Sequence, residues 1–353
     1  RQMCIRDSQM ASLQIAQHFA PLVNEVKAAS DAGQPHMDTV MKKLSELKFY
    51  MQTIQKSPEP SQTALKAIMA ELNLERTNPT VDLKRLANEM AEPLSTQLNR
   101  VADEAWTLEL KTALSEINAL WNRNVYSFYK SRIANRYPLN RKASENISLD
   151  DFREFFGPNG RVQRFYNDYL KFFLEDNAEL SVVNGESVIS SSFLAALQDL
   201  QNIQRNYFDA SGNVNISFSL KPLGLSGKFT ASTFNIDGQL LKYSHEVPSA
   251  SRLIWPNTTR QDVETSLTLV TSTGETSTLR RTGEWSLFRV LDQAAKKANG
   301  QSVDLSFKLN GGAINYRLTV ENGTNPFFGG VLGNFRLPSK LLDTEKEGKS
   351  SLE

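Results

Sequence analysis

The chain has 353 residues, of which 40% are hydrophobic and 22% charged, so it can form two or three domains with buried cores and does not have the composition of a disordered protein. Its 40 lysines and arginines balance 39 aspartates and glutamates, and a net charge of +1 gives no general attraction to nucleic acid or anionic lipid. One cysteine and three histidines exclude an intramolecular disulfide framework and leave little material for a zinc or copper site, and no apolar run is long enough to cross a bilayer.

The two ends differ from the rest of the chain. Residues 1–10 show no helical or strand period and are either foreign sequence or a frayed native end. They also lack the apolar segment of a secretory signal. If the protein works outside the cytoplasm, we therefore expect its export element and membrane anchor upstream of this fragment. Residues 339–353 are expected to form a C-terminal tail, and all but one of the last eight are small, polar or charged.

Residues 11–208 predict a helical region. Apolar side chains recur at helical spacing, over residues 15–26, 37–56, 64–74, 98–121, 152–156, 162–173 and 190–207. Ser61 is expected to cap the helix over residues 64–74, and Pro93 to start or kink the long helix that reaches Trp121. A break near residues 140–150 leaves open whether this region is one domain or two subdomains.

Residues 209–338 predict a β-sandwich, because apolar and polar residues alternate with a period of two after Phe208. Pairs of such strands flank turn sequences, namely Asp237 with Gly238, Thr273 with Gly274, and Asn310 with Gly311. One helix is expected to interrupt the strands, over residues 284–298. The predicted fold class is α+β and multidomain, with an all-α N-terminal region followed by a mostly antiparallel sandwich that contains one inserted helix.

No group of residues predicts an enzyme or a cofactor site. Gly227 and Lys228 lack the flanking residues of a phosphate-binding loop, and residues 224–227 fall one residue short of a Gly-x-Ser-x-Gly nucleophile motif. His18, His36 and His245 stand far apart, without a helical histidine partner. We therefore expect no catalytic residues, no cofactor and no metal.

A local basic and aromatic segment allows two interpretations. Residues 121–143 hold six lysines and arginines, no acidic residue, and aromatic residues such as Tyr126 and Tyr129. Such a segment can bind single-stranded nucleic acid, or it can be a solvated helix face whose aromatic side chains point inward. Because the whole chain has no basic excess, the second interpretation is favoured and no nucleic-acid partner is expected.

Five short sequence blocks, in their order along the chain, resemble those of a known protein family. They are RYPL at residues 136–139, DFREFFGPNG at 151–160, Trp255 with Pro256, GEWSLFR at 283–289 and FRLP at 335–338. This order, over residues 80–340, resembles the C-terminal region of the IcmF/TssM family, the large inner-membrane proteins of the bacterial type VI secretion system. The family's membrane helices and its cytoplasmic domain, which carries a nucleotide-binding motif in some members, have no counterpart here.

The resemblance implies the periplasmic segment of an inner-membrane protein. Its expected function is that of a scaffold in the membrane core complex, which bridges the inner and outer membranes without being an enzyme. The implied partners are the outer-membrane lipoprotein TssJ, docked through the β domain, the inner-membrane protein TssL, and further copies of the chain. A single cysteine is compatible with an oxidising compartment, since a lone thiol cannot mispair within the chain.

Apolar residues on the strand connections are the candidates for protein binding, because interfaces are anchored by a few large apolar side chains. They are Leu223, Leu225, Leu253, Ile254, Trp255, Pro326, Phe327 and Phe328. The alternative for Trp255, Phe327 and Phe328 is that they plug the ends of the sandwich. A carbohydrate- or peptidoglycan-binding module that uses Trp255 and Tyr243 is the second functional hypothesis. A hydrolase is the third, and it lacks a matched nucleophile and base.

Overall fold

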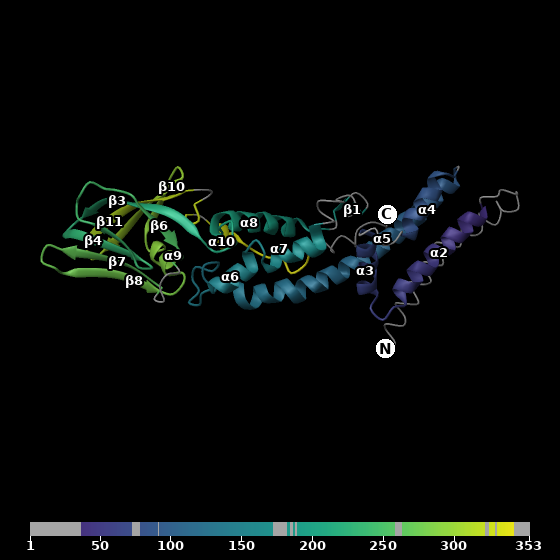
Figure 1. Ribbon diagram of the computed structural model, residues 1–353, viewed down its shortest axis with the longest axis horizontal. Helices are drawn as coiled ribbons and strands as arrows, with labels where there is room; N and C mark the ends of the chain where they lie inside the picture. The colour runs from purple at the N-terminus through teal and green to yellow at the C-terminus, as the bar shows by residue number, and fades with distance from the viewer. Residues whose placement is uncertain are drawn as a thin grey trace, which may run out of the picture. The chain divides into compact units, whose positions relative to one another are not determined.

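The computed structural model describes residues 37–72, 78–90, 92–171, 182–183, 186–187, 189–257, 263–321, 325–328 and 330–341. The chain divides into two compact units, residues 1–120 and 121–353 (Figure 1). Helices precede two antiparallel sheets in the chain, which confirms the predicted α+β class. The stripe over residues 15–26 and the predicted C-terminal tail after residue 341 lie outside the described residues.

The first unit is built from amphipathic helices. They are α2 (Met37–Gln55), α3 (Pro60–Leu72), α4 (Pro79–Asn88) and α5 (Leu94–Trp121), whose last residue belongs to the second unit. The side chain of Asn78 caps α4 by accepting a hydrogen bond from the backbone N–H of Thr80 at 2.9 Å. The prediction that Ser61 caps a helix over residues 64–74 was wrong. The helix begins at Pro60, whose fixed φ and missing N–H suit the first helical position, so Ser61 lies inside it.

A buried polar cluster joins the helices of this unit. The carboxylate of Glu109, on α5, is 1% exposed and accepts hydrogen bonds from the hydroxyl of Tyr50, on α2, and from the side-chain amide of Asn78. The same amide donates to Glu71, on α3, at 2.7 Å. Removal from water raises the pKa of Glu109 to about 7, although the two hydrogen bonds oppose the shift. Glu109 is therefore a titratable group at the centre of the unit.

We predict that the stability of the chain decreases between pH 5 and pH 8, and that Glu109→Gln makes this dependence weaker. The pKa of Glu109 is about 7 in the folded chain against a reference of 4.5, so its contribution is complete below pH 4.5 and is lost as the pH rises through 7. A shift of this size corresponds to on the order of 3 kcal/mol. Thermal unfolding of the full chain at several pH values, followed by circular dichroism, measures it.

Part of the pH dependence should survive in this variant. Asp237, buried in the second unit, also has its pKa raised by burial, to about 6, and contributes with the same sign. The account of Glu109 is contradicted if the wild-type chain and Glu109→Gln lose stability equally between pH 5 and pH 8.

The second unit begins with helical segments that pack beside one another (Figure 1). They are η1 (Asn122–Tyr126), η2 (Tyr129–Ile133), α6 (Leu149–Phe156), α7 (Arg161–Phe165), η3 (Tyr166–Leu170) and α8 (Ser191–Tyr207). The segments labelled η are π-helical turns. Ser148 and Ser190 cap α6 and α8 through their hydroxyl groups, which accept backbone N–H bonds from Asp151 and Phe193. The strands β1 (Val182–Val183) and β2 (Glu186–Ser187) pair as a short hairpin.

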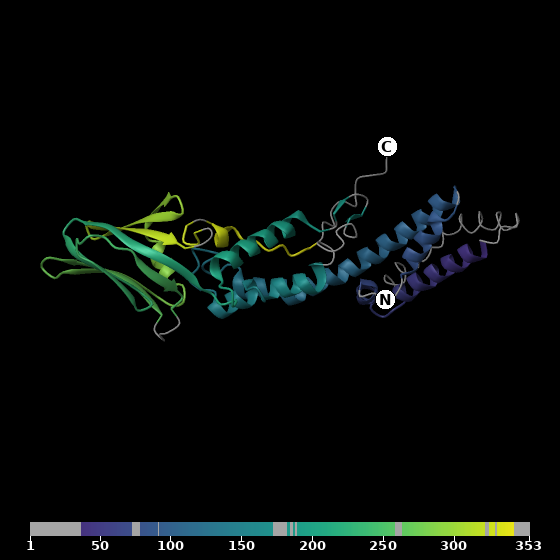
Figure 2. The ribbon, with the colours of Figure 1, turned by 45° about the horizontal axis from the view of Figure 1, so that its top comes forward.

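The β-sandwich consists of two antiparallel sheets, which Figure 2 shows as separate layers. One sheet has the order β6-β3-β11-β10-β9 and the other the order β5-β4-β7-β8. The bounds are β3 Ile216–Ser226, β4 Phe229–Ile236, β5 Gln239–Tyr243, β6 Ser251–Trp255, β7 Glu264–Thr271, β8 Thr276–Thr282, β9 Ala295–Asn299, β10 Ser302–Leu309 and β11 Gly312–Val320. Buried residues alternate with exposed or half-exposed ones along the strands, as the period of two predicts.

The three predicted hairpins are confirmed in position, and those at Asp237–Gly238 and Asn310–Gly311 also in turn chemistry. Asp237 and Gly238, which join β4 to β5, both have positive φ, at 48° and 83°. Asn310 and Gly311, which join β10 to β11, have φ values of 43° and 83°. Two positive φ values in a two-residue turn give the twist that matches the flanking strands, and Asn-Gly and Asp-Gly adopt them most easily.

The helix predicted over residues 284–298 was wrong in its extent. The structure has a short helix, α9 (Ser286–Leu291), and residues from Ala295 to Asn299 form the edge strand β9, paired with β10. Alanines and lysines favour a helix locally, but the turn at Gly300 (φ 59°) returns the chain as a hairpin, and sheet pairing overrides the local preference. A further short helix, α10 (Val331–Asn334), follows the sandwich.

Candidate protein-docking surface

The helix α9 attaches the sandwich to the loop that contains the RYPL block. The guanidinium of Arg289, on α9, lies 4.0 Å from the ring centroid of Tyr137 and donates a hydrogen bond to the side-chain oxygen of Asn146 at 2.6 Å. The indole N–H of Trp285 donates to the backbone oxygen of Ile147 at 2.7 Å. The backbone N–H of Leu149 in turn donates to the carboxylate of Glu284, so the loop is held from several directions.

One carboxylate, that of Asp292, bridges the cationic side chains at this contact. Asp292, directly after α9, accepts hydrogen bonds from the Tyr137 hydroxyl at 2.8 Å and the Arg141 guanidinium at 2.8 Å, and from the Lys296 ammonium at 3.2 Å. Lys296 also donates to the backbone oxygen of Phe327 at 3.1 Å. Burial lowers the pKa of Lys296, and Asp292 opposes that shift. Burial, together with the neighbouring Asp292, raises the pKa of Tyr137. Asp292 is therefore the shared acceptor that joins the helical loop, the sandwich and the C-terminal segment.

Three of the five family blocks meet in one buried aromatic cluster. Trp285 has ring contacts with Phe152, Trp255 and Phe288 at centroid distances of 5.3, 5.0 and 5.2 Å. The ring of Phe288 lies 5.0 Å from that of Phe327. We call this set, with Asp292 and Arg289 above it, the junction cluster. It has the structural role of holding helices and sandwich together.

The predicted docking residues divide into buried and exposed ones. Leu225, Leu253, Trp255 and Phe327 have exposed fractions of 8, 5, 0 and 1%, and Pro326 is also buried. For Trp255 and Phe327 this supports the alternative that they are core residues. Leu223, Ile254 and Phe328 are exposed, at 39, 41 and 37%.

Two of the exposed residues belong to the five-stranded sheet. Leu223 lies at a β-bulge in β3, where Pro222 pairs with Tyr316 and Gly224 pairs with Asn315, so Leu223 has no partner residue in the register. Ile254 lies on the edge strand β6 opposite Ser217. Alternation in the sequence indicates which side chains point outward, but only the strand order shows that β3 and β6 are neighbours.

Three of the five aromatic residues in the basic segment over residues 121–143 are buried, while Tyr126 and Phe128 are half-exposed. Trp121, Tyr129 and Tyr137 are buried, and Trp121 also donates a hydrogen bond from its indole N–H to the backbone oxygen of Pro338 at 3.0 Å. The ring of Phe128 is covered by the Arg161 guanidinium, 4.5 Å from its centroid. Buried rings cannot stack on bases, so the packing fits the interpretation as a solvated helix face.

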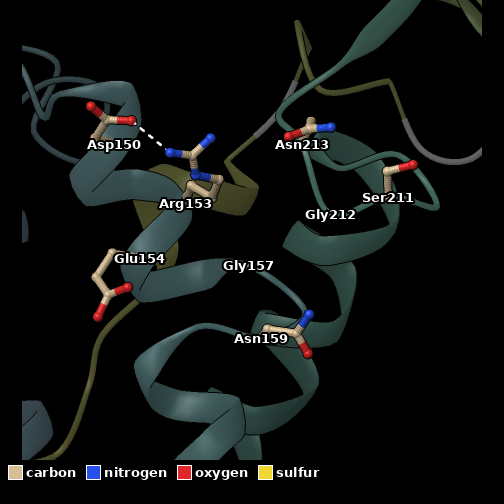
Figure 3. A pocket seen from close by; sticks show the side chains of 8 residues that line it. All are labelled: Asp150, Arg153, Glu154, Gly157, Asn159, Ser211, Gly212 and Asn213. Carbon is tan, nitrogen blue, oxygen red and sulfur yellow. Dashed lines mark hydrogen bonds and ion pairs between the residues drawn. The ribbon is translucent and has the colours of Figure 1, made fainter.

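A polar pocket of about 470 Å³ lies between α6 and the turn that leads into the sandwich (Figure 3). Its lining residues are Asp150, Arg153, Glu154, Gly157, Asn159, Ser211, Gly212 and Asn213. Its two carboxylates are paired with arginines, Asp150 with Arg153 at 2.8 Å and Glu154 with Arg164 at 2.8 Å. The lining contains no nucleophile next to a base. The pocket therefore does not resemble an active site.

Two family models match the chain on either side of the start of the sandwich. The type VI secretion protein IcmF helical domain matches residues 112–213, and the IcmF C2-like domain matches residues 218–322. The chain belongs to the IcmF/TssM family of type VI secretion proteins. The five sequence blocks of this family therefore map onto the junction cluster and the segments around it. None of the described helices is both long and apolar enough to span a membrane.

Known relatives agree with this assignment. The type VI secretion system component TssM1 of Pseudomonas aeruginosa is 25% identical over 352 residues, which is 94% of this chain but 30% of that protein. The chain thus spans about a third of the length of this relative.

Solved structures give the same fold. A structure described as the TssM C-terminal domain from EAEC is 26% identical with a TM-score of 0.55, and the match covers 65% of this chain and 99% of that one. A chain of a type VI secretion system membrane core complex is 23% identical with a TM-score of 0.72, over 92% of this chain and 70% of that chain. At that identity the second match shows the fold alone.

We predict that Asp292→Asn destabilises the chain by about 2–4 kcal/mol. The variant leaves the partly buried ammonium of Lys296 without its counter-charge and weakens the hydrogen bonds from Tyr137 and Arg141. Urea denaturation of the full chain measures the change.

Glu321→Gln is the matched control, because it removes one carboxylate from an exposed pair with Arg252 and should cost at most about 1 kcal/mol. Equal effects of the two substitutions would show that Asp292 is an ordinary surface residue.

Proposed function

We propose that this chain is the periplasmic scaffold segment of the type VI secretion membrane core complex. In this proposal its β domain docks the outer-membrane lipoprotein TssJ, while an inner-membrane part of the protein, with TssL as its companion, completes the bridge between the membranes. Several copies of the chain associate in the complex. Membership of the family that contains TssM1 and the likeness of the fold to a chain of a membrane core complex support this assignment.

The observation that carries the proposal is the combination of a rigid sandwich with exposed apolar side chains. The junction cluster attaches the sandwich firmly to the helices, and Leu223 and Ile254 remain 39 and 41% exposed on the five-stranded sheet. The described residues contain no group of three or more histidines, cysteines, aspartates or glutamates placed to hold a metal. A scaffold needs a stable body and an accessible binding surface, and the packed sandwich with its exposed apolar side chains supports that role.

The structure argues against the peptidoglycan-binding alternative, because the main residue proposed for sugar binding is buried. Trp255 is fully buried against Trp285 and Phe288, so its ring is not available to stack on a sugar. Tyr243 is half-exposed and has a ring contact with His245. Cosedimentation with purified cell wall separates the two functions, since the scaffold stays in the supernatant.

We predict that Ile254→Asp weakens binding of TssJ by roughly tenfold, because a desolvated apolar contact is replaced by a charge. Leu240→Asp is the matched control. Leu240 is 58% exposed and lies on β5, in the other sheet, so the same chemical change should leave the affinity unaltered. Titration of immobilised TssJ, lacking its lipid anchor, with the full chain gives both constants. The proposed function fails if the wild-type chain does not bind TssJ.

A further inference from the structure

The outer face of the five-stranded sheet has an ordered arrangement of charges. In the strand registers, Lys221 on β3 stands opposite Arg317 on β11, which stands opposite Asp304 on β10, which stands opposite Lys297 on β9. The result is one row of four charged residues across four strands, three of them cationic. Lys308, on the same face of β10 as Asp304, adds a further exposed ammonium near the hairpin turn.

The carboxylates of this face are already neutralised by partners on the face itself. Asp304 accepts hydrogen bonds from the Arg317 guanidinium at 2.7 and 3.0 Å and from the Asn299 amide at 3.2 Å. Glu321 pairs with Arg252 at 2.6 Å. The described residues provide no ion-pair partner within 4.0 Å for Lys221, Lys297 or Lys308. The face therefore carries an excess of positive charge although the chain as a whole is nearly neutral.

Around this row the face carries both polar and apolar side chains. Next to the charged row is a row of hydroxyl and amide side chains, formed by Ser219, Thr319, Ser302 and Asn299. The exposed apolar residues Leu223 and Ile254 flank the cations on the β3 and β6 side. Leu223 and Ile254 lie on the face of a sheet and not on protruding loops. They therefore suit contact with another protein better than insertion into a lipid bilayer.

The other sheet of the same sandwich lacks these features. Its outer face carries a row of threonines, Thr233, Thr268 and Thr278, in which the last two hydroxyl groups are hydrogen-bonded at 3.0 Å. The guanidinium of Arg280 is paired with Glu264. One lysine, Lys242, is exposed there, opposite Thr233. Because one face is more positive than the other, a negatively charged partner would be attracted to that face of the sandwich.

We propose that the outer face of the five-stranded sheet docks an acidic surface of TssJ, with Lys221, Lys297 and Lys308 facing carboxylates of the partner and with Leu223 and Ile254 forming the apolar part of the contact. The proposal rests on the proposed function and adds the face and the chemistry of the partner surface. Attraction between the two surfaces accelerates their encounter and is weakened by salt, because the Debye length shortens from about 10 Å at 0.1 M to about 3 Å at 1 M salt.

The test is a pair of charge reversals in the full chain. In Lys221→Glu/Lys308→Glu, neither new carboxylate faces another one, because the cross-strand neighbours are Arg317 and Ala313. We expect this variant to bind TssJ, lacking its lipid anchor, about tenfold or more weakly at 50 mM salt, mainly through slower association. The wild-type affinity should fall as salt increases. Lys242→Glu, the matched reversal on the other face, should bind like the wild-type chain.

The outcomes distinguish this proposal from the proposed function. If the wild-type chain binds TssJ and the double variant binds equally well at an unchanged melting temperature, the assignment of the face is overturned while the function stands. If Lys242→Glu is the variant that loses binding, the other face is the docking site. If the double reversal removes binding to vesicles of anionic phosphatidylglycerol but leaves TssJ binding intact, the occupant is a membrane. If the wild-type chain does not bind TssJ, the proposed function itself fails.

Discussion

Asp292 with its three hydrogen-bond donors, together with the buried aromatic cluster, attaches the sandwich to the helices of the second unit. Without the carboxylate, the partly buried ammonium of Lys296 would have no counter-charge at the point where three chain segments meet. Trp285, beneath it, fills the space between helices and sandwich with every polar atom of its indole satisfied. The sandwich is therefore attached to the helices through packed rings and satisfied polar groups.

This attachment explains why the sequence blocks that identify the family are not on the proposed docking face. The RYPL, GEWSLFR and FRLP blocks contribute Tyr137, Arg289 and Phe335 to buried or half-buried contacts inside the unit. The docking face is instead made of serines, threonines and lysines on the outward positions of strands, which many side chains can occupy without affecting the fold. The sequence blocks that identify the family thus belong to the buried framework. The proposed partner surface could be located only from the strand registers.

Most of the fold could be predicted from the sequence because its signals are local. The period of two and the Asp237–Gly238 and Asn310–Gly311 turns define hairpins without reference to the rest of the chain. The helix predicted through residue 298 failed because β9 exists only through its pairing with β10, a contact that local preference does not encode. The exposure of the candidate docking residues could be predicted less well for the same reason. Trp255 is buried because α9 covers it, and Leu223 is exposed because of a bulge.

The central claim is that helices and sandwich of the second unit form one cooperative body through the junction cluster. Native-state hydrogen exchange of the full chain tests it most directly, since it gives an opening free energy for each protected amide. The account predicts that amides in α6, in α9 and in the central strands β3 and β11 open together, with a common free energy and a common dependence on denaturant. An opening of α6 at distinctly lower free energy, with the sandwich still protected, would contradict it.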